Sequence, residues 1–165
     1  MKTKHFAFKV IAAVIILVCI WLYPIVMPRH IPDEFSPDIQ DTIEHSTSMF
    51  IYSLDPLSAL VTASPKSTTP VFHEHSILKS KKVVKSSERE RIVDSLYRSI
   101  GKAEQASCFN PRHGLRFMKG PQTVDIVICF ECANVMIYNG NQDRTSPAPI
   151  SNYALPILDG ILSSP

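Results

Sequence analysis

Apolar side chains are distributed along this chain in three patterns, and each pattern predicts a different kind of element. From Val10 to Met27 no charged residue interrupts the apolar run, which is about as long as a membrane-spanning helix. Over residues 87–105 the apolar positions recur at helical spacing. From Thr123 to Tyr138 they occupy both alternating sets of positions and are rich in Val and Ile. That pattern is typical of a strand covered on both faces.

The strand expected at Thr123–Tyr138 has a natural partner in a second extended segment, His113–Met118. The residues between them, 119–122, read Lys-Gly-Pro-Gln, in which Gly tolerates positive φ and Pro presets φ, as a turn requires. If the glycine lies near the hairpin centre, residues whose numbers sum to about 240 face each other. Cys108 then lies opposite Cys132, close enough for a disulfide.

Helix-start signals mark further elements. Ser36 followed by Pro37 suits an N-cap and the first helical position. Ser87 and Glu90 form a capping box ahead of the apolar stripe. A third helical spacing of apolar residues lies near the C-terminus. The expected helices cover residues 37–45, 87–105 and 153–162.

Two other regions have strand character: Met49–Leu54, and one or two segments within Val71–Lys85. We therefore expect an α+β fold, a mainly antiparallel sheet of about four strands with helices packed on it, preceded by one N-terminal transmembrane helix. Residues Asn139–Asn152, with Asn-Gly and two prolines, predict a long loop that could cover a partner site.

The N-terminus predicts a single-pass signal anchor. Three lysines lie in residues 1–9, only Arg29 follows the apolar run closely, and no small-residue cleavage pattern follows it. The positive-inside rule then places residues 1–9 in the cytoplasm, 10–27 in the inner (cytoplasmic) membrane, and a linker, 28–36, with an α+β domain, 37–165, outside the cytoplasm. Cleavage of the segment is the alternative. The net charge of +2 gives no case for nucleic-acid binding.

An extracytoplasmic domain meets an oxidising compartment in which disulfides persist. Cys19 lies within the apolar run, so three cysteines remain for the domain. We expect Cys108 and Cys132 to form a disulfide and Cys129 to be buried and inert.

Three other uses of the same cysteines stay open. Cys129 and Cys132 have the spacing of a thioredoxin-like redox pair, but they lie in a strand pattern and no helix start follows. Zinc could be held by Cys108, His113, Cys129 and Cys132, although a second matching cysteine knuckle is missing. Cys108 and His113 are also a candidate nucleophile and base.

Several polar residues are candidates for binding. Arg112 and His113 next to a glycine could contact an anion or a partner, whereas Arg112 could instead pair with Glu131. His73 and His75 would share a face of a strand, as half of a metal site or as a solvated pair.

A basic run consists of Lys79, Lys81, Lys82 and Lys85. These lysines could contact anionic lipid headgroups or form a solvated strand face.

The segments Cys108–Gly114 (Cys-Phe-Asn-Pro-Arg-His-Gly), Val124–Cys132 and Ile51–Pro56 (Ile-Tyr-Ser-Leu-Asp-Pro) carry a resemblance. The chain from about residue 50 onward resembles a group of uncharacterised bacterial exported or membrane-anchored proteins. The resemblance implies a shared architecture and supplies no activity.

The expected function is therefore that of a membrane-anchored extracytoplasmic domain, a non-catalytic binding or structural protein with one disulfide and no cofactor. The sequence shows no paired carboxylates, no complete triad and no phosphate-binding glycine loop. The alternative is a thiol-redox or zinc site built on the cysteines and His113.

Overall fold

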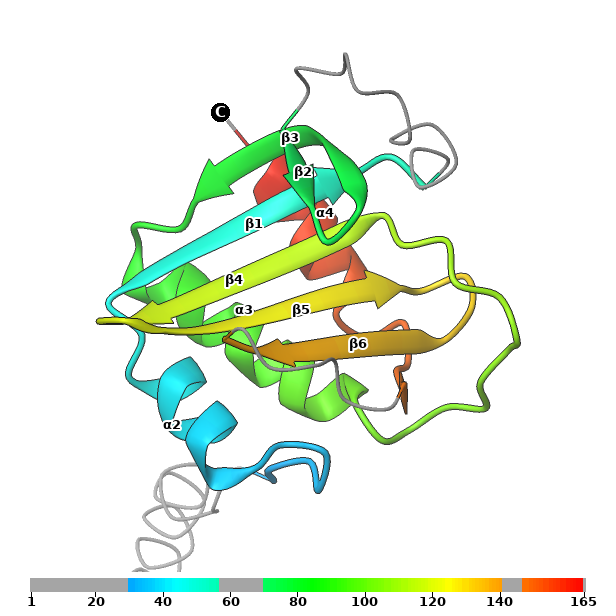
Figure 1. Cartoon of the computed structure of the whole chain (residues 1–165), viewed down its shortest axis with the longest axis horizontal. Helices are drawn as coiled ribbons and strands as arrows, with labels where there is room; N and C mark the ends of the chain where they lie inside the picture. The colour runs from blue at the N-terminus through cyan, green and yellow to red at the C-terminus, as the bar shows by residue number, and fades with distance from the viewer. Residues whose placement is uncertain (1–29, 57–69, 141–146, 165) are drawn as a thin grey trace, which may run out of the picture. The chain divides into compact units, whose positions relative to one another are not determined.

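A computed structural model describes residues 30–56, 70–140 and 147–164 (Figure 1). The chain divides into Met1–His30 and Ile31–Pro165, and the fold described here is that of the second unit. Its helices are α2 (Pro37–Glu44), α3 (Ser86–Ser99) and α4 (Leu155–Ser163). Its strands are β1 (Ser48–Leu54), β2 (Val71–Phe72), β3 (His75–Lys82), β4 (His113–Lys119), β5 (Gln122–Cys129), β6 (Asn134–Asn139) and β7 (Ala148–Pro149).

The strands form one antiparallel sheet of seven strands in the order β2-β3-β1-β4-β5-β6-β7. The expectation of about four strands is wrong. The segment Thr123–Tyr138 is two strands, β5 and β6, separated by a tight turn in which Ala133 has φ 51°. The turn was hidden in the sequence because its Phe130 and Cys132 are buried, so the apolar run continues through it. Residues Asn139–Asn152 also contain a short strand, β7, where a loop was expected.

The central hairpin turns where the sequence predicted, but its register differs by one residue. Leu115 pairs with Ile126 and Lys119 with Gln122, so paired numbers sum to 241. A two-residue turn at Gly120 and Pro121 sets this sum. A shift of one residue matters because it changes which side chains of β4 and β5 lie on the same face of the sheet.

None of the described helices is long and apolar enough to cross a membrane. The predicted transmembrane helix at residues 10–27, with the cytoplasmic segment 1–9 before it, lies outside the described residues. The described part of the predicted linker, residues 30–36, is not separate from the domain. Its Phe35 is buried and lies 5.4 Å from the ring of Tyr97, centroid to centroid.

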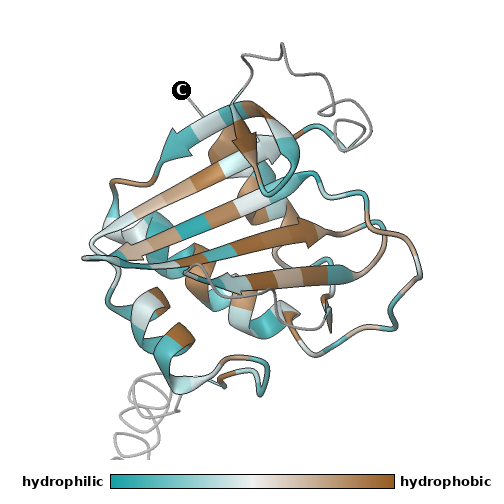
Figure 2. Cartoon of the chain, in the orientation of Figure 1, coloured by the Kyte–Doolittle hydropathy of each residue, from teal (hydrophilic) through white to brown (hydrophobic). Residues whose placement is uncertain are grey.

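All the described helices pack on one face of the sheet, where they enclose the larger hydrophobic core (Figures 1 and 2). On α3 the predicted apolar stripe is confirmed: Ile92, Leu96 and Ile100 are almost completely buried. From the sheet, alternate side chains such as Leu115 and Phe117 meet them. Burial of one face of each element is what holds these layers together.

The helix ends follow the sequence signals only in part. Ser36 caps α2 as predicted, because its hydroxyl accepts a hydrogen bond from the amide of Ile39. The capping box predicted at Ser87 is wrong: the N-cap of α3 is Lys85, two residues earlier, and no side chain caps the helix. The helix also stops at Ser99 rather than near residue 105.

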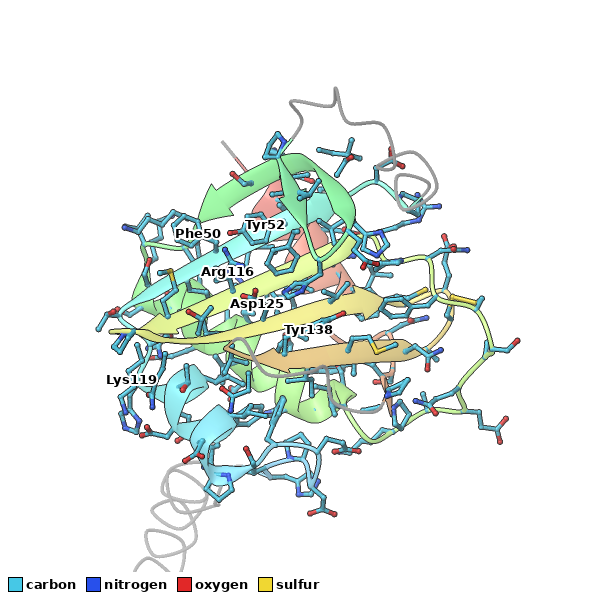
Figure 3. All side chains as sticks on the ribbon, in the orientation of Figure 1. Phe50, Tyr52, Arg116, Lys119, Asp125 and Tyr138 are labelled. Atoms are coloured by element: carbon cyan, nitrogen blue, oxygen red, sulfur yellow. A yellow bond between two sulfur atoms is a disulfide. The ribbon has the colours of Figure 1, made fainter. Side chains whose placement is uncertain are left out.

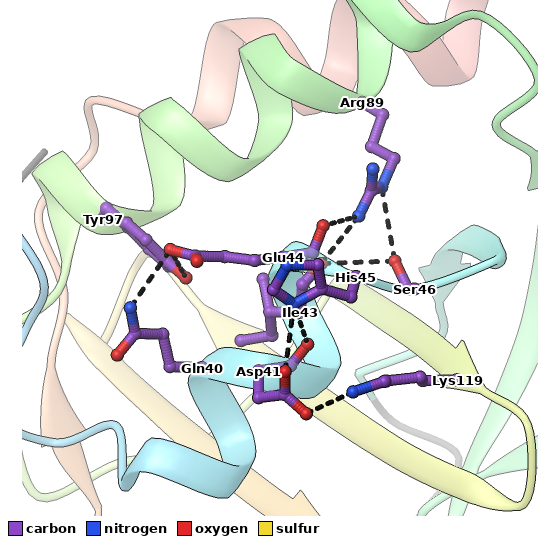
Figure 4. Close-up of polar contacts among 9 residues, drawn as sticks. All are labelled: Gln40, Asp41, Ile43, Glu44, His45, Ser46, Arg89, Tyr97 and Lys119. Atoms are coloured by element: carbon purple, nitrogen blue, oxygen red, sulfur yellow. Dashed lines mark hydrogen bonds and ion pairs between the residues drawn. The ribbon is translucent and has the colours of Figure 1, made fainter.

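The C-terminal end of α2 is completed by a cation from another helix (Figure 4). Arg89 on α3 donates from Nη2 to the backbone carbonyls of Ile43 and Glu44, at 2.9 and 2.5 Å. Its Nε also donates to Ser46 Oγ at 3.2 Å. Carbonyls of the last helical turn have no partner within the helix and carry partial negative charge, so a guanidinium stabilises them. Arg89 thereby fixes α2 to α3.

Two lysines of β3 donate hydrogen bonds to the C-terminal carbonyls of α4. Lys79 Nζ donates to the carbonyl of Leu162, and Lys81 Nζ donates to the carbonyls of Ile161 and Ser164, each at 3.1 Å. The last turn of α4 has no basic residue of its own. Part of the basic run therefore has a structural role that its sequence did not reveal.

Candidate functional site

The face of the sheet opposite the helices is the candidate site (Figure 3). Successive side chains of a strand point to opposite faces, so alternate residues of β1, β4, β5 and β6 lie here. We call the solvent-facing half of this surface the open face. It consists of Phe50, Arg116, Met118 and Tyr138, and it borders the buried residues Tyr52 and Asp125.

The other half of this surface is covered by the turn between β2 and β3. Phe72 packs against Tyr52 with a centroid distance of 4.6 Å, and it lies directly over Gly114. His73 stacks on Tyr138 with a centroid distance of 3.7 Å and an angle of 17° between the rings. The turn thus forms a wall along one side of the open face.

That turn has an unusual backbone. His73 and Glu74 have φ angles of 47° and 72°, the left-handed region, in a two-residue hairpin connection. Such turns favour Asn and Gly, because other side chains are strained there. Strain of this kind persists where surrounding contacts enforce it, and it is common at functional sites. Here the contacts are those of Phe72 and His73 with the sheet.

A buried carboxylate organises the site. Asp125, with 7% of its side chain exposed, receives two hydrogen bonds from Arg116 on the neighbouring strand, at 2.8 Å from Nε and 2.6 Å from Nη2. His73 Nε2 lies 2.7 Å from Asp125 Oδ2. The guanidinium of Arg116 also lies over the ring of Phe72, 5.2 Å from its centroid. One carboxylate therefore positions both the arginine and the strained turn.

The electrostatics of this network are those of a stable ion pair. Burial acts to raise the pKa of Asp125, but the hydrogen bonds from Arg116 and His73 outweigh it, so the pKa lies below its ordinary value. The hydrogen bond that Arg116 donates to Asp125 raises the pKa of Arg116. Burial raises the pKa of Tyr52. Asp125 is thus an ionised carboxylate whose two oxygens are both engaged, which suits positioning better than proton transfer.

The close contact of Phe72 with Gly114 gives a direct test of how the turn is held. A Cβ at residue 114 would lie 2.7 Å from Cε1 of Phe72 and 2.8 Å from its Cδ1. We expect Gly114→Ala to displace the turn and to lower the free energy of unfolding by about 1–3 kcal/mol, the usual range for overpacking.

Gly160 on α4 is the matched control, because nothing lies within 4 Å of a Cβ placed there and its φ is not positive. Gly160→Ala should stabilise the protein by up to about 1 kcal/mol, as alanine does within a helix. Urea unfolding measures both. Equal effects of the two variants would contradict the packing described for Phe72.

The structure joins Cys108 to Cys132, the pair that the sequence favoured, with 5.6 Å between their Cα atoms. Both lie outside the paired strands, and the disulfide ties the loop before β4 to the β5–β6 turn. Cys129 is a buried free thiol, and its Sγ accepts a hydrogen bond from the amide of Cys132 at 3.2 Å. Asn134 adds hydrogen bonds to the carbonyls of Ala106 and Cys108.

The remaining predicted residues are placed apart from the open face. Arg112 forms an exposed ion pair with Glu131, 3.2 Å from Nε to Oε1. His113 is buried on the helix side, where its Nε2 lies 2.8 Å from Asp159 Oδ1 and its ring meets Phe130 edge-on. The structure therefore does not bring Arg112 and His113 together as one binding corner.

The two histidines do not lie on one strand as predicted. His73 belongs to the turn and His75 to β3, although they are near enough to interact electrostatically. Burial lowers the pKa of His75. In residues 30–56, 70–140 and 147–164 no group of three His, Cys, Asp or Glu side chains could hold a metal ion. Cys108 and Cys132 are disulfide sulfurs here, whereas a zinc ligand is a thiolate.

The sequence patterns do not mark Arg116, Asp125 or Tyr138 as site residues. A signal was present for Asp125, because it is the one charged residue within the apolar run Val124–Phe130. The predicted register placed residue 124, not Asp125, opposite Arg116, so it did not predict the ion pair.

Comparison of this chain with protein-family models, with curated proteins and with solved structures finds no match.

Proposed function

We propose that this chain is a non-catalytic binding protein, anchored to the outer side of the cytoplasmic membrane, which recognises a protein partner through its open face. The observation that carries the proposal is the composition of that face. Half-buried Phe50, Met118 and Tyr138 surround Arg116 where a solvated sheet face would normally carry polar residues. Aromatic residues, methionine and arginine are the types enriched in protein interfaces.

The preorganisation of the face supports the same proposal. Tyr138 is held by the stacked ring of His73, and Arg116 is held by Asp125. Side chains fixed before binding lose less conformational entropy when a partner arrives. The contacts that hold the strained turn therefore also fix side chains of the open face before a partner binds.

The location in this proposal rests on the sequence and on the disulfide. The apolar run at residues 10–27 has the length of a membrane anchor, and the lysines before it favour a cytoplasmic N-terminus. The Cys108–Cys132 disulfide suits an oxidising compartment outside the cytoplasm.

Thiol–disulfide exchange is the second candidate function. It is favoured by one observation: Cys129 Sγ accepts a hydrogen bond from the backbone amide of Cys132, one of the two disulfide cysteines. Exchange would require a thiolate at Cys129, whose side chain is almost completely buried. The binding proposal does not need that thiol to react.

Photo-crosslinking tests the binding proposal on the full chain in the cells that produce it. A benzophenone amino acid at Tyr138 should yield a discrete adduct with one protein, whereas the same amino acid at Arg91, exposed on α3, should not. Adding Met118→Lys to the Tyr138 probe should remove the adduct, because a charge would be desolvated in the interface. Adducts of equal yield from residues 91 and 138, or none from residue 138, would contradict the proposal.

A further inference from the structure

The outer edge of β3 is a second surface with the features of a binding site, and it is independent of the open face. β2 covers only the start of β3, through the pairs Val71–Ser76 and Phe72–His75 and a hydrogen bond from Ile77 N to Pro70 O. In the part of the chain that the structure describes, no strand pairs with residues 78–82 on this side. Figure 1 shows β3 at this border of the sheet, with β2 beside its first part only.

The register with β1 determines which backbone groups lie along this edge. Val83 N donates to Met49 O, and antiparallel strands alternate between hydrogen-bonded and non-hydrogen-bonded pairs. Lys79 and Lys81 therefore direct their N–H and C=O groups toward β1. Ser80 and Lys82 direct theirs outward, where an added strand would find two donors and two acceptors.

The side chains along the edge indicate the chemistry of the added strand. Leu78, which the register shift between Ser53 and Leu54 leaves unpaired with β1, and Val84, two residues beyond the end of β3, are 66% and 82% exposed. The segment Val71–Lys85 carries four lysines and a single glutamate. An incoming strand with carboxylates at alternate positions would place them beside Lys79 and Lys81, whose Nζ atoms also donate to carbonyls of α4. Its apolar residues would cover the exposed leucine and valine.

A second copy of this chain fits the edge less well. If two β3 edges paired antiparallel about Ser80, Lys79 of one copy would lie opposite Lys81 of the other. Directly opposed like charges destabilise a pair of strands. Lysines on an edge strand are a known means of preventing such self-pairing, and the same charges attract an acidic segment.

We propose that residues 78–84 receive an extended acidic segment of another protein by β-strand addition. The proposal does not depend on the open face, because its contacts are the outward backbone groups of β3. The positive charge of the three lysines in this segment is what selects an acidic strand over a neutral one.

The probe for the test is a capped seven-residue peptide in which valine and glutamate alternate, and its control alternates valine and lysine. Amide hydrogen exchange of the full chain, dispersed in detergent micelles, is followed by NMR. In the free protein, the amides of Ser80 and Lys82 should exchange fast while those of Lys79 and Lys81 are protected. The acidic peptide should slow exchange at Ser80 and Lys82, and the basic peptide should not.

Ser80→Pro removes one outward donor without touching the ladder to β1, a place where edge strands tolerate proline. It should weaken the acidic peptide about tenfold, the effect of one lost hydrogen bond. Met118→Lys on the open face should leave peptide binding unchanged, which separates this proposal from the one above. Three results would overturn the proposal. The amides of Ser80 and Lys82 could be protected from exchange in the free protein, or their protection could rise with protein concentration alone. The third is an acidic peptide that binds the Ser80→Pro variant as tightly as the native protein.

Discussion

Replacing Asp125 by Asn should lower the free energy of unfolding at pH 7 by about 2–3 kcal/mol, the scale of hydrogen bonds to a charged group. The variant keeps the shape of the side chain but leaves Arg116 without a counter-charge and His73 without its carboxylate partner. Loss of a fully buried partner would cost more, but the side chain of Arg116 is 37% exposed and regains water. Because His73 is no longer held, the turn over the sheet should also loosen. Urea unfolding measures the first effect, and amide exchange at residues 72–74 measures the second.

The pH dependence of the same variant identifies the cause. The pKa of Asp125 is lower in the folded protein than its unfolded value of about 3.9. Its stabilisation is therefore fully present above that unfolded pKa and is lost as the pH falls through the folded pKa. The difference between the native protein and Asp125→Asn should shrink below about pH 4.

Asp33→Asn is the matched control, since the same chemical change at an exposed residue should alter stability by less than about 0.5 kcal/mol. A stability difference for Asp125→Asn that stays constant between pH 7 and pH 3, or no difference at all, would contradict the network described for the site.

Removing the disulfide with Cys108→Ala and Cys132→Ala together should lower the free energy of unfolding by about 3 kcal/mol. The bond closes a loop with a sequence separation of 24, and cross-linking a loop of that length restricts the unfolded chain by about this amount. We expect a fall in Tm of about 10 °C. Calorimetry under oxidising conditions measures it.

A reductant provides the control for the disulfide. It should lower the Tm of the native protein to that of the double variant and leave the double variant unchanged. The same samples test thiol exchange, because a thiol-blocking reagent should label Cys129 only after unfolding if that thiol is inert. Rapid labelling of Cys129 in the folded protein would instead favour the redox function. A double variant with unchanged Tm would show that the disulfide is not stabilising.

The sequence by itself determined the local elements whose signals lie within a few residues. Ser36 and Pro37 specify the start of α2, and the apolar stripe of α3 needs no partner to be recognised. Lys-Gly-Pro-Gln at residues 119–122 specifies a turn, and the hairpin it creates brings the cysteines Cys108 and Cys132 near each other. These features depend on φ preferences and on periodicity, which are properties of the chain alone.

Strand number and register depended on more than local pattern. The β5–β6 turn buries Phe130 and Cys132, so hydrophobicity does not mark it as a turn. The difference of one residue in register came from the two-residue turn at Gly120 and Pro121, and it decided which residues face each other. With that register fixed, Arg116 lies directly opposite Asp125, which makes the ion pair of the site.

Only the tertiary structure decided where isolated charges find their partners. Arg89, Lys79 and Lys81 look like solvated surface residues in the sequence, yet each completes the C-terminal end of a helix far along the chain. Likewise, His73 reaches Asp125 only because the turn folds back over Gly114. Such pairings join segments that are far apart in the sequence, so local patterns determine the segments and their packing determines the site.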